Sequence, residues 1–187
     1  QVNGANTSAV RVTNNNANLT DLIIDHSTFS SQSSANGQAY VILSGQGTSV
    51  MTVHVQNGTR FTGLYGSAIV AGAGESGSST ATVNVNVANS TFDAAAANGL
   101  NDLEMQALQS GTLNLSIQNN TFDGVGIPLA GVGVINVQAV DQGKLNGTIS
   151  GNTIQNVAGY MGIRVSSTGS APGPHNLHIE NNNLYNV

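Results

Sequence analysis

The chain has 187 residues, of which only 7% are charged, and four Lys or Arg against nine Asp or Glu give a net charge of −5. Nucleic-acid binding, which needs a basic patch, is therefore not expected, and no run of about 18 apolar residues predicts a membrane span. Hydrophobic residues make up 39% of the chain and Cys is absent. These features argue against wholesale disorder and exclude disulfides and thiolate metal sites.

Two short strands are predicted to recur in each coil of a repeating unit. The first strand of each coil has sequences such as A-V-R-V and G-I-R-V and begins at Ala9, Tyr40, Ala68, Leu103, Ile135 and Gly162. The second strand alternates apolar and polar residues, which is typical of a strand with one buried face. Its two apolar columns are Leu22, Val53, Val85, Leu115, Gly147 and Leu177, and Ile24, Val55, Val87, Ile117, Ile149 and Ile179.

An apolar anchor follows each second strand, in the motif N-N-T-F or a variant of it. The anchors are Phe29, Phe61, Phe92, Phe122, Ile154 and Leu184, at intervals of 32, 31, 30, 32 and 30 residues. Placing Val55 in its column requires one inserted residue, which we assign to Arg60. Residues at one phase of a stacked repeat meet their own counterparts, so we expect an aromatic ladder.

The repeat predicts the fold. A unit of about 31 residues without a helical pattern cannot bury its apolar face alone, whereas stacked copies bury one continuous core. We therefore predict an all-β, single-domain parallel β-helix over residues 1–187, with about six coils and no obvious end caps. A β-sandwich of short strands is the competing fold, but it would not place every Phe at one interval.

The pattern x-L-x-I-x-N-N-T-F, a Gly-rich gap and then G-I-x-V resembles the right-handed parallel β-helix of pectate-lyase-like proteins. It is also similar to the non-enzymatic β-solenoids of bacterial surface and secreted proteins. The resemblance covers nearly the whole chain and implies a right-handed coil, which the crossover rule also favours. It does not imply one activity, because this fold carries many.

Two sets of Asn recur at fixed phases. Asn84, Asn114, Asn146 and Asn176 form a predicted outward amide column, which is a candidate ligand or packing face or simply stabilises the sheet. A predicted polar ladder occupies the turn before the anchors and contains Asn89, Asn119 and Asn181, with His26 and Asn57 at the same place.

Asp93 and Asp123 each follow a ladder Phe and should lie on adjacent coils. Such a pair is a weak candidate for Ca²⁺ binding or for sharing a catalytic proton. Two solvated turn aspartates are the simpler interpretation, so we predict no catalytic residue, metal or cofactor. His54 and His178 share a column but lie four coils apart, too far to bind one metal ion.

These observations favour a structural, extracellular or cell-surface β-solenoid. The last residues, L-Y-N-V, lead into the first strand in the same phase as I-Q-N-V leads into G-I-R-V, so copies could stack head to tail, or the chain could continue a longer repeat. The alternative is a polysaccharide-binding or polysaccharide-degrading β-helix, with Tyr40, Tyr65 and Tyr160 as further candidate sugar contacts.

Overall fold

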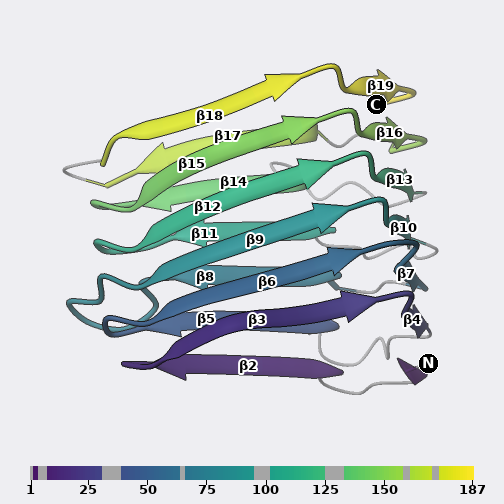
Figure 1. Ribbon diagram of the computed structural model, residues 1–187. Helices are drawn as coiled ribbons and strands as arrows, with labels where there is room; N and C mark the ends of the chain where they lie inside the picture. Colours follow the sequence, from purple (N-terminus) through teal and green to yellow (C-terminus); the bar gives the residue numbers. More distant parts are fainter. Residues whose placement is uncertain are drawn as a thin grey trace.

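The computed structural model describes residues 2–3, 8–30, 39–63, 66–94, 102–124, 133–157, 161–169 and 173–187. Over these residues the chain forms β-strands in three parallel sheets (Figure 1). Within the same ranges no helix is long and apolar enough to cross a membrane. The predicted all-β parallel solenoid is therefore confirmed.

The first sheet is built from the first strand of each coil. Its six strands are β2 (Val10–Asn15), β5 (Val41–Gln46), β8 (Ile69–Ala73), β11 (Leu103–Ala107), β14 (Gly133–Val140) and β17 (Met161–Thr168). Strands next to one another in the sheet come from successive coils and pair in parallel.

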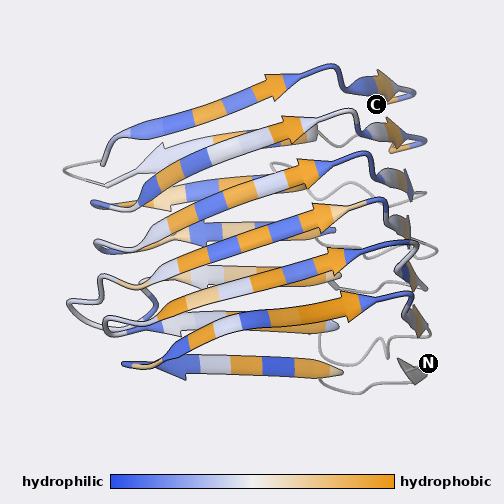
Figure 2. Cartoon of the chain, in the orientation of Figure 1, coloured by the Kyte–Doolittle hydropathy of each residue, from blue (hydrophilic) through white to orange (hydrophobic). Residues whose placement is uncertain are grey.

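The second sheet contains the alternating strands. These are β3 (Asn18–Asp25), β6 (Val50–Gln56), β9 (Thr82–Ala88), β12 (Thr112–Gln118), β15 (Lys144–Ser150) and β18 (His175–Glu180). In β9 and β12 every second residue is buried, and Figure 2 shows this alternation as orange and blue bands. The register brings both predicted apolar columns into line across the sheet.

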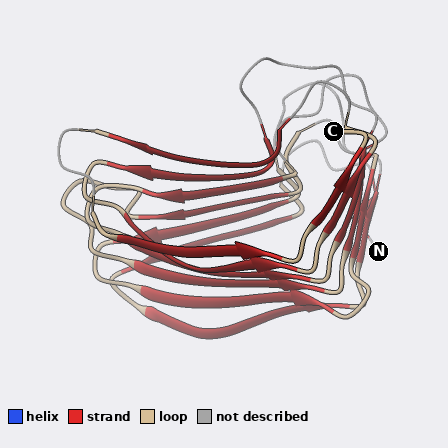
Figure 3. Cartoon of the chain, turned by 90° about the horizontal axis from the view of Figure 1, so that it is seen from above, coloured by secondary structure: helices blue, strands red, loops and turns tan. Residues whose placement is uncertain are grey.

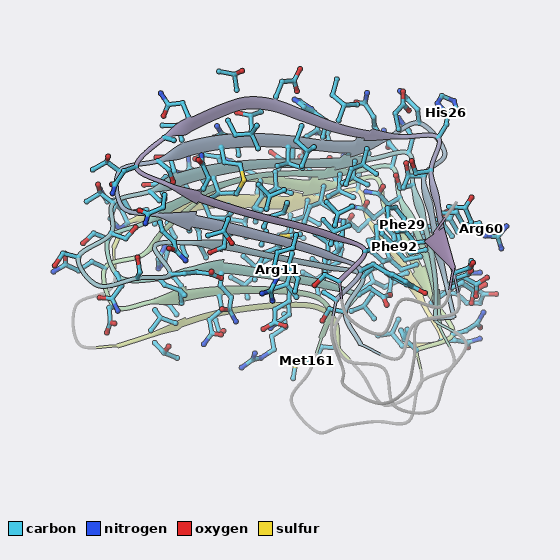
Figure 4. All side chains as sticks on the ribbon, turned by 90° about the horizontal axis from the view of Figure 1, so that it is seen from below. Arg11, His26, Phe29, Arg60, Phe92 and Met161 are labelled. Atoms are coloured by element: carbon cyan, nitrogen blue, oxygen red, sulfur yellow. The ribbon has the colours of Figure 1, made fainter. Side chains whose placement is uncertain are left out.

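The third sheet is short and holds the anchors. It contains β1 (Val2–Asn3), β4 (Thr28–Ser30), β7 (Arg60–Thr62), β10 (Thr91–Ala94), β13 (Thr121–Gly124), β16 (Thr153–Gln155) and β19 (Asn183–Tyr185). The rings of Phe29, Phe61, Phe92 and Phe122 stack with centroids 4.8, 5.0 and 4.6 Å apart. Ile154 and Leu184 continue the column in register. Figure 4 shows Phe29 and Phe92 pointing into the interior.

Seen along the axis, the first and second sheets face each other and the third closes one end of the core (Figure 3). The chain runs anticlockwise in this view while it rises toward the viewer, so the coil is right-handed, as predicted. The six strand levels of the two long sheets are separated by five steps, so the solenoid makes about five turns of roughly 31 residues.

At five of the six levels, the corner between the second and third sheets is a single residue with positive φ. His26, Asn89, Asn119 and Asn181 adopt φ between 45° and 56° there, and Gly151 takes the same place with φ 65°. Asn tolerates this left-handed conformation better than most residues because its side chain bonds locally. The sharp corner leaves the next residue facing the core.

Arg60 is not the inserted residue. It pairs with Thr28 on one side and Thr91 on the other, so it belongs to the column that precedes the anchors. The extra residue lies in the corner, where Asn57 and Gly58 both have positive φ (52° and 77°). A two-residue corner absorbs the insertion without moving Phe61 out of the stack.

Gly147, the exception in an apolar column, is explained by a close backbone approach. A Cβ at this position would lie 1.9 Å from the carbonyl oxygen of Leu115 on the level below, and Gly147 has φ 135°. Only glycine accommodates both conditions.

Candidate ligand-binding face

The outer face of the second sheet carries regular columns of polar side chains. One column contains Thr52, Asn84, Asn114, Asn146 and Asn176, and the next contains His54, Asn86, Ser116, Thr148 and His178. Most of these side chains are half-buried by their neighbours, but Asn176 and His178 on the last level are exposed. The amide column predicted from the sequence therefore lies on one face in consecutive register.

The amides of this column form a directional hydrogen-bond ladder. Nδ2 of Asn146 donates to Oδ1 of Asn114 over 3.0 Å, and Nδ2 of Asn114 donates to Oδ1 of Asn84 over 2.7 Å. Asn84 ends the ladder by donating to Oγ1 of Thr52 over 3.0 Å. The ladder stabilises the stacking of levels and fixes the orientation of each amide.

A shallow groove of about 190 Å³ lies between the two columns on β6, β9 and β12. One wall is made by Thr52, Asn84 and Asn114, and the other by His54, Asn86 and Ser116. Nδ2 of Asn86 lies 3.3 Å from Nδ1 of His54, whose Nε2 lies 3.5 Å from a carboxylate oxygen of Asp21. Oδ1 of Asn86 is buried and has no hydrogen-bond partner.

The buried polar ladder lies one residue after the position that the sequence suggested. Asn89, Asn119 and Asn181 are the exposed corner residues. Asn120 and Asn152, which follow a corner residue, are buried, and Nδ2 of Asn120 donates to Oδ1 of Asn152 over 3.0 Å. Asn182 continues this ladder by accepting from Nδ2 of Asn152 over 2.9 Å. Two Asn stand side by side in N-N-T-F, and the spacing alone does not show which of them faces inward.

Asp93 and Asp123 are paired in register on adjacent levels, but each carboxylate has other partners. Asp93 forms an exposed ion pair with Arg60 over 3.1 Å, and Figure 4 shows Arg60 directed to solvent. Asp123 accepts hydrogen bonds from Nε2 of Gln155 and Nδ2 of Asn156, both over 2.9 Å. Across the described part of the chain, no three His, Cys, Asp or Glu side chains gather in a possible metal site.

Asp102 is a titratable group that the sequence reasoning missed. It directly precedes β11, pairs through its backbone with Ala68, and is 6% exposed. Burial, with a smaller contribution from the charge of Asp93, raises the pKa of the Asp102 carboxyl to about 7. No local motif marks this residue, because its position is occupied by Tyr40 and Ala68 in other coils.

The outer face of the first sheet holds a second polar row that the sequence reasoning did not recognise. Glu104, Asn136 and Arg164 are consecutive in register on β11, β14 and β17. Nη1 of Arg164 donates to Oδ1 of Asn136 over 3.0 Å, and Nε2 of Gln106 donates to Glu104 over 2.7 Å. The coil alignment of the first strands could have revealed this row.

The remaining sequence candidates do not converge. His54 and His178 share a column, with three levels between theirs. His26 lies at an exposed corner beside Asp25, 2.9 Å away, and points outward in Figure 4. Tyr40 is fully buried and its hydroxyl donates to the carbonyl of Thr62 over 3.2 Å, so it is not a surface sugar contact. Tyr65 and Tyr160 lie outside the described residues.

Comparison of the chain with family models, curated proteins and solved structures finds no match. The parallel β-solenoid is therefore shown by the structure itself, and the resemblance to pectate-lyase-like and bacterial surface proteins stays a prediction.

Proposed function

We propose that the chain is a structural β-solenoid of the extracellular space or cell surface, a segment of an adhesin or a subunit of a filament, whose end turns stack head to tail. The proposal rests on the exposure of apolar side chains in the last level of strands, β17, β18 and β19. There Ile179, Leu184 and Val165 are 49%, 44% and 46% exposed, although their register partners Ile149, Ile154 and Val137 on the level below are fully buried.

The two end levels are complementary. The last level offers the free edges of β17, β18 and β19, and the first level offers those of β2, β3 and β1, in the same three sheets. Within each sheet all strands run parallel. The first level of a second copy would therefore meet the last level with the same strand direction as in every pairing between neighbouring levels of one chain. The apolar columns then continue across the junction, and such a head-to-tail contact propagates into a filament.

The extracellular location rests on composition. Charged residues make up 7% of the chain, Cys is absent, and Asn, Ser, Thr and Gly are abundant. We assign no catalytic residue in this function, because the ion pair and amide contacts described above engage Asp93 and Asp123.

Electron microscopy and sedimentation velocity of the purified chain at increasing concentration test the stacking. We expect rods that lengthen in steps on the order of 30 Å, which is six levels at the strand spacing of a sheet. Ile179→Lys places a charge in the exposed core column and should leave single particles. The control Val70→Lys alters a half-buried residue on the outer face of β8, an interior strand that lies away from both end levels, and should still form rods. A monomer at every concentration, or equal loss in both variants, would contradict the proposal.

A polysaccharide-cleaving enzyme is the second candidate, and Asp102 is the observation in its favour. A carboxyl with a pKa of about 7 near the Asp93 carboxylate is the kind of pair that supplies a general acid beside an ionised partner. Release of reducing ends or unsaturated products from pectin-like polymers, abolished in Asp102→Asn, would establish this activity. The structural function predicts no such release.

A further inference from the structure

The third sheet contains one strand more than each of the other two. The first and second sheets have six strands and the third has seven, because β1 precedes the first strand of the first sheet. Along the chain the coil passes through the first, second and third sheets in turn, so the regular successor of β19 is a strand of the first sheet. In a second copy, however, the first described strand is β1, which belongs to the third sheet. Two chains therefore cannot be stacked end to end with every strand in its place.

The conflict lies at one edge of β4. β1 covers this edge, with Val2 opposite Phe29 and Asn3 opposite Ser30, and β7 pairs with the other edge. Figure 1 shows β1 below β4 at the end of the column of short strands. If β2 and β3 of a second copy pair with β17 and β18, then β4 of that copy must pair with β19 through the edge that its own β1 covers. β19 of one copy and β1 of the next compete for the same place.

A junction that keeps β1 in place would leave a gap in the two long sheets. β1 of the second copy would pair with β19, and its β2 and β3 would lie one level farther out. β17 and β18 would then be about 9.6 Å from their partners, twice the strand spacing of a sheet, which no hydrogen bond spans. Such a junction gives up the pairing of strands of eight and six residues to keep that of a strand of two residues. The long sheets therefore favour the loss of one short strand.

Of the two competing strands, β19 is held more firmly on its own chain. It pairs with β16 over three residues, whereas β1 pairs with β4 over two. Further backbone hydrogen bonds hold the ends of β19. The N–H of Asn183 donates to the carbonyl of Asn152 over 2.8 Å, and the N–H of Val157 donates to the carbonyl of Asn186 over 3.0 Å. Displacing β1 therefore costs less than displacing β19.

We propose that β1 is a displaceable strand and that the edge of β4 beneath it is the docking surface for β19 of a second copy. The proposal rests on the head-to-tail stacking proposed above and adds the exchange that limits it. Leu184 and Phe29 belong to the same register column, so the exchange places Leu184 of one copy against Phe29 of the next. Leu184 is 44% exposed in the single chain, and the contact buries it. In the single chain β1 keeps the docking edge closed and raises the concentration at which rods form.

Deletion of residues 1–3 tests the exchange, with rod formation followed by sedimentation velocity at increasing protein concentration. We expect the deletion variant to form rods at a concentration at least tenfold lower than the wild type, because the edge of β4 is open from the start. Asn3→Thr is the matched opposite variant, since Thr is enriched in strands and Asn is depleted. It should hold β1 in place and raise the required concentration about twofold or more. Circular dichroism checks that both variants keep the strand content of the wild type.

The rise per chain in wild-type rods, measured by cryo-electron microscopy, gives a second test that needs no variant. Exchange of the strands predicts about 29 Å, which is six levels at the strand spacing, whereas a junction that keeps β1 predicts about 34 Å, which is seven. A rise of seven levels, an unchanged concentration for the deletion variant, or a shift in the same direction for both variants would overturn the exchange while stacking itself stands. Rods formed by the deletion variant alone would support it. If neither the wild type nor the deletion variant forms rods, the proposed stacking fails and the exchange fails with it.

Discussion

The amide of Asn152 connects three levels of the solenoid. Its Nδ2 donates to the carbonyl of Ile117 and to Oδ1 of Asn182, and its Oδ1 accepts from the backbone N–H and Nδ2 of Asn120. Asn152→Ala leaves these partners unpaired at a cost of about 1–3 kcal/mol each, so we expect the free energy of unfolding to fall by about 3 kcal/mol or more. Urea denaturation followed by circular dichroism measures the change.

Asn119 is the matched comparison, one residue before a ladder Asn but exposed, with φ 55°. Asn119→Gly should leave stability unchanged or slightly raised, because glycine adopts this conformation without strain. If Asn119→Gly destabilised the chain as much as Asn152→Ala, the assignment of the structural ladder to the buried column would be wrong.

Asp102 makes stability depend on pH. Burial, reinforced by the charge of Asp93, raises the pKa of this carboxyl from 3.8 to about 7. Between these two values the unfolded chain has released the proton that the folded chain still holds, so the unfolded state binds fewer protons and stability falls as the pH rises. We expect the wild type to be more stable at about pH 5 than at about pH 8.

Asp102→Asn removes this titration and should be more stable than the wild type at about pH 8, with a flatter dependence of the denaturation midpoint on pH. Glu180→Gln is the control, since Glu180 is exposed on the last level and its loss should leave the pH dependence intact. An unchanged slope in Asp102→Asn would show that another group is responsible.

At the scale of the strand, the Phe stack of the third sheet is a continuous column in which each ring depends on two neighbours. Phe92 lies between Phe61 and Phe122 and is fully buried. Phe92→Ala opens a cavity and should cost about 3–5 kcal/mol. Leu184→Ala in the same column should cost only about 1 kcal/mol, because that side chain is already half exposed. Equal losses in thermal or urea denaturation would contradict a core that runs through this column.

Much of the strand arrangement could be predicted because strand positions that face the core must carry apolar side chains. The interval between Phe residues and the alternation in strands such as β9 reflect burial, which the sequence records directly. The corner could not be resolved in the same way. Asn119 and Asn120 are identical in type but opposite in role, and the corner at Asn57 and Gly58 absorbs an insertion that spacing alone assigned to Arg60.

Only one wall of the candidate groove could be predicted from the sequence, for a related reason. The amide column was predictable because Asn84, Asn114 and Asn146 recur at one phase. The opposite wall is chemically mixed, with His54, Asn86 and Ser116, so no repeated residue type marks it. Asp102 breaks an otherwise apolar column, and its burial comes from the packing of the coil and not from its sequence neighbours.

At the scale of the whole molecule, each turn contacts only the turns above and below it, so stability is a sum of local terms and neighbour interfaces. Strands β9 and β12 have partners on both sides and fully alternating burial, whereas β18 and β19 pair on one side only. Hydrogen exchange followed by mass spectrometry should therefore show the slowest exchange in β9 and β12 and faster exchange toward β18 and β19. Stacking adds a concentration dependence. The protection of β18 should rise with protein concentration in the wild type and in the control Val70→Lys, but not in Ile179→Lys. Protection that is uniform along the axis would mean that the solenoid opens as one cooperative unit, and the end levels would then have no separate stability for a second copy to increase.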